Sequence, residues 1–112
     1  MESSMVENYY DNERFMNSFE AISLIQDFFQ KKLPEFELKN KYNDPRGYWG
    51  IEYKKTESIV KLESARGIFE PSIHISGTRY SLSQLDKRMK EIKTSSEKNI
   101  LFTLTLIKRF FG

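Results

Sequence analysis

The chain has 112 residues, a length that suits one domain with a single hydrophobic core. Its 18 Lys and Arg against 16 Asp and Glu leave a net charge of +2, too small to mark a general binder of polyanions. The absence of cysteine excludes disulfides, thiolate metal sites and thiol nucleophiles, and a single histidine excludes a His-rich metal site. We therefore expect a non-enzymatic protein with no catalytic residues, metal or cofactor.

The N-terminal segment argues against a secretory signal. Residues 1–14 carry four acids and only Arg14 as a base, whereas a signal peptide begins with basic residues. No apolar run reaches the roughly 18 residues that a membrane helix needs. We expect a cytoplasmic protein that does not bind membranes, with residues 1–112 forming one domain and residues 1–11 a frayed lead-in.

Residues 12–32 are predicted to form an amphipathic helix. Asp11 or Asn12 can cap its start, because a short side-chain oxygen accepts a hydrogen bond from a free backbone N–H. The helix should end before Pro34, since the residue preceding a proline is pushed out of helical space. Apolar residues recur at spacings of three and four and should face the core: Phe15, Phe19, Ile22, Ile25 and Phe29.

The middle of the chain is predicted to form a small sheet. Residues 34–47 are interpreted as a connector, because positions 43–47 are dense in turn-forming residues. Strand-like runs follow at 48–55, 58–65 and 68–76, and the short turns between them indicate an antiparallel meander. Pro71 should place the third run at a sheet edge or in a bulge, because proline cannot donate a ladder hydrogen bond.

The C-terminal third is predicted to be mainly helical. Ser81 and Gln84 have the spacing of a capping box, which predicts a helix over 82–94 with Leu82, Leu85, Met89 and Ile92 on its apolar stripe. Residues 100–111 fit either a strand or a helix. The helix is favoured, because Ser95 or Ser96 can cap it and Gly112 can end it.

The predicted fold class is therefore α+β. It consists of an N-terminal helix, a three-stranded antiparallel meander and one or two C-terminal helices packed on one face of the sheet. His74 lies between two isoleucines of the third strand, and nothing near it in sequence supplies an orienting acid or a nucleophile. We interpret it as a structural or surface histidine.

The first helix also carries a mixed acidic and apolar outer face. Glu13, Glu20 and Asp27 are seven residues apart and share one stripe, with large apolar residues beside it. The stripe could be an ordinary solvated face, with the apolar residues meeting the C-terminal segment. Alternatively it binds a protein, with acids that steer a basic partner and apolar groups that anchor it. The candidate partner-binding residues are Glu13, Met16, Asn17, Glu20, Leu24 and Asp27.

Charge is uneven along the chain. Residues 1–20 carry a net charge of −4 and residues 81–112 a net charge of +4. Either the two ends attract one another within the molecule, or the acidic end binds a partner.

A second set of residues combines bases with aromatic side chains. Such a set can pair with phosphates and stack on nucleobases, although aromatic residues at strand starts also serve as core and rim. The alternative nucleic-acid-binding residues are Arg46, Trp49, Lys54, Lys55, Arg79 and Tyr80.

The predicted order of a helix, three strands and a helix resembles the double-stranded-RNA-binding domain. That family opens its second helix with a lysine-rich motif, whereas residues 81–85 here contain no base and the first one is Lys87. Its Gly-Pro-x-His loop is replaced by residues 54–57. We keep nucleic-acid binding as the alternative to a protein-binding function.

In overall character the chain resembles the small immunity proteins of bacterial toxin systems, including contact-dependent inhibition. It is short, free of cysteine, rich in lysine and aromatic residues, and without a catalytic constellation. The resemblance carries no diagnostic motif, so no residue roles are transferred. It implies an antitoxin that inhibits a cognate toxin, often a nuclease, by direct binding. A basic nuclease cleft would complement the stripe at Glu13, Glu20 and Asp27.

A third possibility is a structural subunit whose residues 100–111 dock on another chain.

Overall fold

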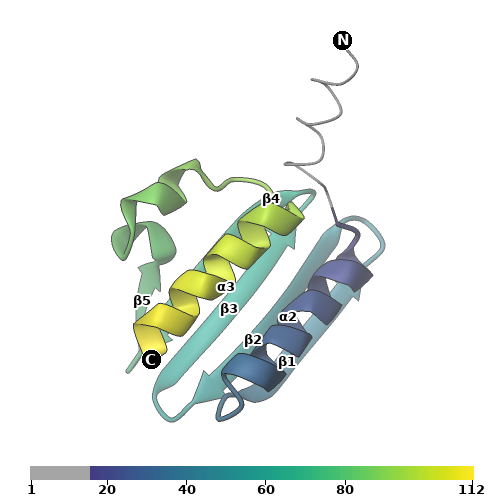
Figure 1. Cartoon of the computed structure of the whole chain (residues 1–112). Helices are drawn as coiled ribbons and strands as arrows, with labels where there is room; N and C mark the ends of the chain where they lie inside the picture. The colour runs from purple at the N-terminus through teal and green to yellow at the C-terminus, as the bar shows by residue number, and fades with distance from the viewer. Residues whose placement is uncertain (1–15) are drawn as a thin grey trace.

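A computed structural model describes residues 16–112 of the chain. Five strands form one antiparallel sheet in chain order, and α2 and α3 lie next to each other on one face of it (Figure 1). The α+β class with helices on one face is confirmed, but the sheet has five strands, not three. The elements are α2 (Ser18–Lys32), β1 (Glu37–Asp44), β2 (Tyr48–Lys55), β3 (Ser58–Ala65), β4 (Ile68–Ile75), β5 (Thr78–Ser81), the 3₁₀ turns η1 (Leu82–Gln84) and η2 (Lys87–Glu91), and α3 (Glu97–Phe111).

α2 begins at a capping box. The Asn17 side chain accepts from the Glu20 amide at 2.8 Å, and the Glu20 carboxylate accepts from the Asn17 amide at 3.1 Å. Residues 16 and 17 precede the helix, while the predicted caps Asp11 and Asn12 lie outside the described residues, as does Phe15. The predicted end at residue 32 is confirmed.

The buried face of α2 is narrower than the predicted stripe. Ile22, Ile25 and Phe29 are buried as expected. Phe19 is 77% exposed, so its assignment to the core was wrong.

The three predicted strands match β2, β3 and β4 to within one residue. Two-residue turns join them, and Arg66 and Gly67 both have positive φ, 53° and 86°, as a type I′ hairpin turn requires. β4 is internal and pairs with β3 without a bulge, contrary to the expectation for Pro71. Pro71 is tolerated because β5 pairs only with Ser72–Ile75, which leaves no strand beside the proline on that side.

β1 lies in the region interpreted as a connector. It pairs with β2 from Glu37 opposite Lys54 to Asp44 opposite Tyr48, with an irregularity between Leu38 and Asn40. The strand is the sheet's edge, and nearly all of it is exposed. It therefore lacks the alternation of apolar and polar residues by which a half-buried strand is recognised.

The helix predicted over 82–94 was wrong, because this segment forms two short 3₁₀ turns, η1 and η2, instead. The Ser81–Gln84 capping box is present, but the turn that it starts ends at Leu85. Asp86 is extended, with φ −149° and ψ 120°, and its carboxylate accepts from the Arg88 amide at 2.9 Å. A short carboxylate that bonds its own downstream backbone competes with helix formation in this way.

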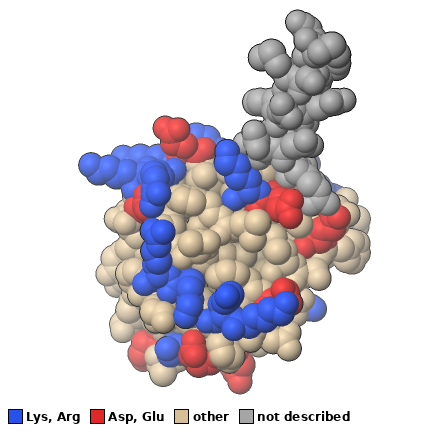
Figure 2. All heavy atoms as spheres, viewed as in Figure 1, with Lys and Arg blue, Asp and Glu red and all other residues tan. Residues whose placement is uncertain are grey.

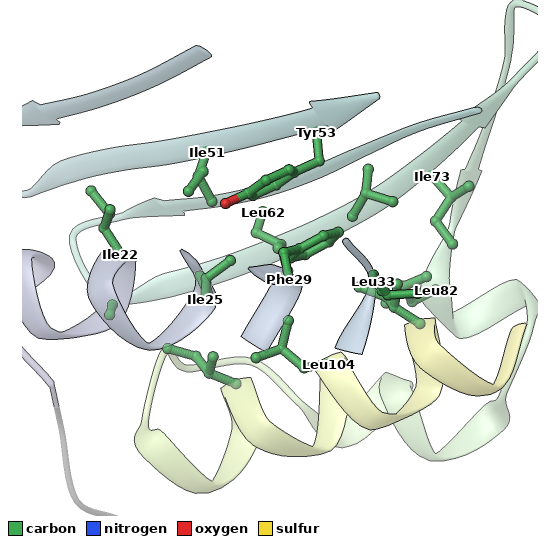
Figure 3. Close-up of a cluster of buried hydrophobic side chains, with 14 of the residues drawn as sticks. Ile22, Ile25, Phe29, Leu33, Ile51, Tyr53, Leu62, Ile73, Leu82 and Leu104 are labelled. Carbon is green, nitrogen blue, oxygen red and sulfur yellow. The ribbon is translucent and has the colours of Figure 1, made fainter. Parts of the chain in front are cut away.

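The core fills the space between the helices and the sheet (Figure 3). Phe29 of α2 stacks on Tyr53 of β2 with ring centroids 3.9 Å apart. The C-terminal segment is the helix α3, as favoured; it is capped by Ser96 and buries Ile100, Leu104 and Ile107. Over residues 16–112, no helix is long and apolar enough to cross a membrane.

Candidate protein-binding surface

The partner-binding residues predicted on the first helix do not form one exposed patch. Asn17 and Glu20 hold the helix start through the capping box. Met16 and Leu24 are partly buried against the core, and so is Phe28. Asp27 is exposed and pairs with Lys31 at 3.2 Å. Glu13 lies outside the described residues.

The predicted nucleic-acid-binding residues are divided between the two faces of the sheet. Trp49 is buried in the core beside Phe69, and Lys55 on the same face lies 5.8 Å from the Phe36 ring. Tyr80 pairs with the buried Ile73, so it too is on the helix-covered face.

The other three predicted nucleic-acid-binding residues lie away from this face. Lys54 and Arg79 belong to the opposite face, in one cross-strand row that also contains His74. Arg46 is held at the β1–β2 turn by Asp44, with contacts of 2.8 and 3.0 Å. The structure therefore does not bring the six residues into one site.

His74 lies on the face of the sheet without helices. Its neighbours across the strands are Ile59 and Arg79, and its buried Nε2 has no hydrogen-bond partner among the described residues. Within residues 16–112, no group of three or more histidines and carboxylates is arranged to hold a metal ion.

One hollow of the described surface lies between α2 and β1. The hollow has a volume of about 490 Å³. Phe19 lines it, and most of the Phe19 side chain is exposed to solvent. α2 packs on α3 and, within the sheet, on β2 rather than on β1, so the helix-facing side of the edge strand is less covered. The lining residues are Phe19, Ile22, Ser23 and Gln26 of α2, and Lys41, Tyr42 and Asn43 of β1.

A second hollow of about 290 Å³ extends the first along the same two elements. Gln26 lines both hollows, and its side-chain oxygen accepts from Lys41 Nζ at 3.3 Å. We call the two hollows together the α2–β1 groove. Besides Gln26, the second hollow is lined by Phe29, Gln30, Pro34, Phe36, Leu38 and Tyr53.

One positive charge lies in this groove. Lys41 is the only charged side chain among the described residues that line it, and its recorded partner is a neutral amide. Lys39 differs, because it pairs with Glu37 and lowers the pKa of that carboxyl. The groove thus combines apolar walls with a single cation that is not paired with any carboxylate of residues 16–112.

Basic side chains form a separate feature on the helix side of the molecule. Figure 2 shows Lys and Arg side chains following one another along one side and the lower part of this view. Bases gather in η2 and in the last turns of both helices, where the helix dipole favours cations. We use the name basic arc for the bases of these three segments, which are Lys31, Lys32, Lys87, Arg88, Lys90, Lys108 and Arg109.

Comparisons with known protein families, with curated proteins and with solved structures find no match to this chain. A functional assignment therefore rests on the surface itself. On this surface the α2–β1 groove combines an exposed aromatic ring, apolar walls and one cation.

Proposed function

We propose that this protein is a non-enzymatic binding protein that docks a partner protein in the α2–β1 groove. We further propose that the partner is a toxin, neutralised by direct binding as in the immunity proteins that the chain resembles. The observation that carries the proposal is the position of Phe19. Its side chain is 77% exposed at a hollow of about 490 Å³, on a helix whose neighbouring apolar residues are buried or half-buried.

An exposed aromatic ring beside a hollow is a typical anchor of a protein interface. Aromatic residues are enriched among the side chains that contribute most to binding. Removing such a ring from water contributes roughly 1.5–3 kcal/mol.

Charges on the same helix support a basic partner. Glu20 and Asp27 are exposed on α2, seven residues apart and therefore on one stripe. Carboxylates near an interface accelerate encounter with a basic surface, and toxins that act on nucleic acid present such a surface to their substrate. Inhibition by coverage of that surface requires no chemistry from the inhibitor.

The experiment compares three tagged proteins as baits in nuclease-treated lysate of the native host: wild type, Phe19→Ser and Ile68→Ser. Ile68 is the matched control, since it is also a large exposed apolar residue but alternates with the buried Phe69 and so faces the other side of the sheet. We expect wild type and Ile68→Ser to retain one stoichiometric protein that Phe19→Ser loses. Retention by all three would contradict docking at the groove.

The toxin part of the proposal has its own test. The captured protein is expressed alone and together with wild type or Phe19→Ser. We expect growth arrest from the captured protein alone, relief by wild type, and no relief by Phe19→Ser. A captured protein without toxicity would contradict neutralisation of a toxin, but it would not contradict docking in the α2–β1 groove.

A second candidate function is nucleic-acid binding, for which the basic arc is the favourable observation. The arc differs from the residues predicted for this function, and part of its charge is neutralised, because Arg88 pairs with Asp86 and Lys31 with Asp27. Binding to phosphates would weaken steeply as salt rises. The test is titration of labelled RNA and DNA at low and at physiological salt, with Lys87→Glu, Lys90→Glu as the disabling variant. No binding at low salt would remove this candidate.

A further inference from the structure

One wall of the α2–β1 groove is formed by β1, the long open edge of the sheet. β1 is the terminal strand, paired with β2 on one side and with no other described strand on its outer side. Its eight residues span about 26 Å at 3.3 Å per residue. β5, at the opposite edge, has four residues and continues directly into η1. β1 therefore offers the longer row of unpaired backbone groups on which another strand can add.

The regular part of this edge lies at the larger hollow. The irregularity between Leu38 and Asn40 interrupts only the first half of β1, and residues 40–44 keep an unbroken register with β2. Lys41, Tyr42 and Asn43, which line the larger hollow, belong to this regular half. An added strand would therefore find regular backbone where the apolar wall of α2 is nearest.

The residues that line the groove also predict which side chains an added strand would carry. Alternate side chains of an added strand would point toward the helix layer. There they would meet Phe19 and Ile22, which favour an apolar residue, and Lys41, which favours a carboxylate in place of its present amide partner. Two positions of one face are two residues apart in a strand, so the expected pattern is an apolar and an acidic residue at i and i+2.

On this basis we infer that the partner docks as an extended segment that adds to the β1 edge, with an apolar side chain beside Phe19 and a carboxylate on Lys41. The inference rests on the proposed function, whose binding site it shares.

The test uses a phage-displayed library of random dodecapeptides as the probe. It is selected in parallel on wild type and on Lys41→Glu. We expect wild type to enrich sequences with an apolar and an acidic residue at i and i+2, and Lys41→Glu to enrich a basic residue at the acidic position. The enriched wild-type peptide is then synthesised, and its affinity should fall about tenfold on Lys41→Glu, the effect of one charge contact of about 1.4 kcal/mol.

Backbone pairing is measured separately by amide hydrogen exchange with this peptide bound. We expect slowed exchange in residues 40–44 and no change in β5. Peptides that bind with unchanged exchange in β1, identical selections on the two proteins, or no enrichment would each overturn strand addition. If the lysate partner is still lost with Phe19→Ser, the proposed binding surface survives that result. If Phe19→Ser retains it, the proposed function fails as well.

Discussion

The ring of Tyr42 in β1 lies over Gly50 of β2, its cross-strand neighbour, and its hydroxyl donates to Glu63 Oε2 at 3.4 Å. A β-carbon at position 50 would lie 2.4 Å from the tyrosine ring, so only glycine leaves room for this arrangement. The contact ties the exposed edge strand to the centre of the sheet. Because β1 forms one wall of the α2–β1 groove, the groove depends on this attachment.

Gly50→Ala is expected to displace the Tyr42 ring and weaken the attachment of β1. The ring is at the surface and can swing away, so the loss should be about 1 kcal/mol, comparable to one hydrogen bond. Burial, and secondarily the Glu63 carboxylate, raise the pKa of Tyr42 in the native protein, and the variant should return that pKa toward its usual value. Tyrosine titration by ultraviolet absorbance, with Tyr42→Phe to assign the signal, checks this. A variant with an unchanged Tyr42 pKa would contradict it.

Truncation after Asn99 is expected to abolish folding. The lost segment includes Ile100, Leu104 and Ile107, which are fully buried. Each such residue contributes about 2–5 kcal/mol when cut back to alanine, against a total stability of 5–15 kcal/mol for typical domains. Circular dichroism of the truncated chain is the measurement. A truncated protein with a cooperative thermal transition would mean that α3 is a docking tail rather than part of the core.

The capping box makes Glu20→Gln the better probe of charge than Glu20→Lys. Glutamine can still accept from the Asn17 amide, so the helix start is preserved while the charge is removed. We expect Glu20→Gln with Asp27→Asn to slow association with a basic partner and to leave the dissociation rate nearly unchanged. Asn17→Ala, in contrast, should lower the free energy of unfolding by about 1 kcal/mol. Surface plasmon resonance and urea unfolding separate the two effects, and an unchanged association rate would rule out steering by these acids.

Asp86 is expected to contribute to stability in mild but not in strong acid. Hydrogen bonds from the Arg88 side chain and backbone lower the pKa of Asp86 from 3.8 to about 2. A lowered pKa stabilises the native state above the unfolded value, and this stabilisation is lost as the pH falls through the native value. Wild type should therefore exceed Asp86→Asn in stability at pH 5, and the difference should shrink between pH 3.8 and about 2. Urea unfolding across this range checks it, and a constant difference would contradict the assignment.

Much of the sheet could be predicted because its hairpins are encoded locally. Gly67 readily adopts the positive φ that its two-residue turn requires, and the alternating residues of β3 and β4 indicate the strands on either side of that turn. β1 could not be predicted in this way, because nearly all of this edge strand is exposed. Its sequence therefore lacks the alternation of apolar and polar residues that marks a half-buried strand. The apolar residues around Asp86 have helical spacing, but Asp86 is extended and its side chain accepts a hydrogen bond from the Arg88 amide. The spacing of apolar residues does not reveal such a contact.

The groove was hidden from the sequence for the same reasons. Phe19 has the spacing of a core residue, and its exposure depends on where α2 lies over the sheet. The other wall of the groove is β1, the strand that the spacing of apolar residues did not predict. Glu20 and Asp27 are exposed, but the exposed large apolar residue of this helix is Phe19 rather than Met16 or Leu24, which are partly buried.

The central claim is that a partner protein contacts the molecule at Phe19. The most direct measurement is photo-crosslinking with benzoylphenylalanine placed at position 19, or at position 68 as the control, in cells of the native host. We expect one covalent adduct at position 19, identified by mass spectrometry, and none of that mass at position 68. Adducts of equal yield at both positions, or at position 68 alone, would contradict it.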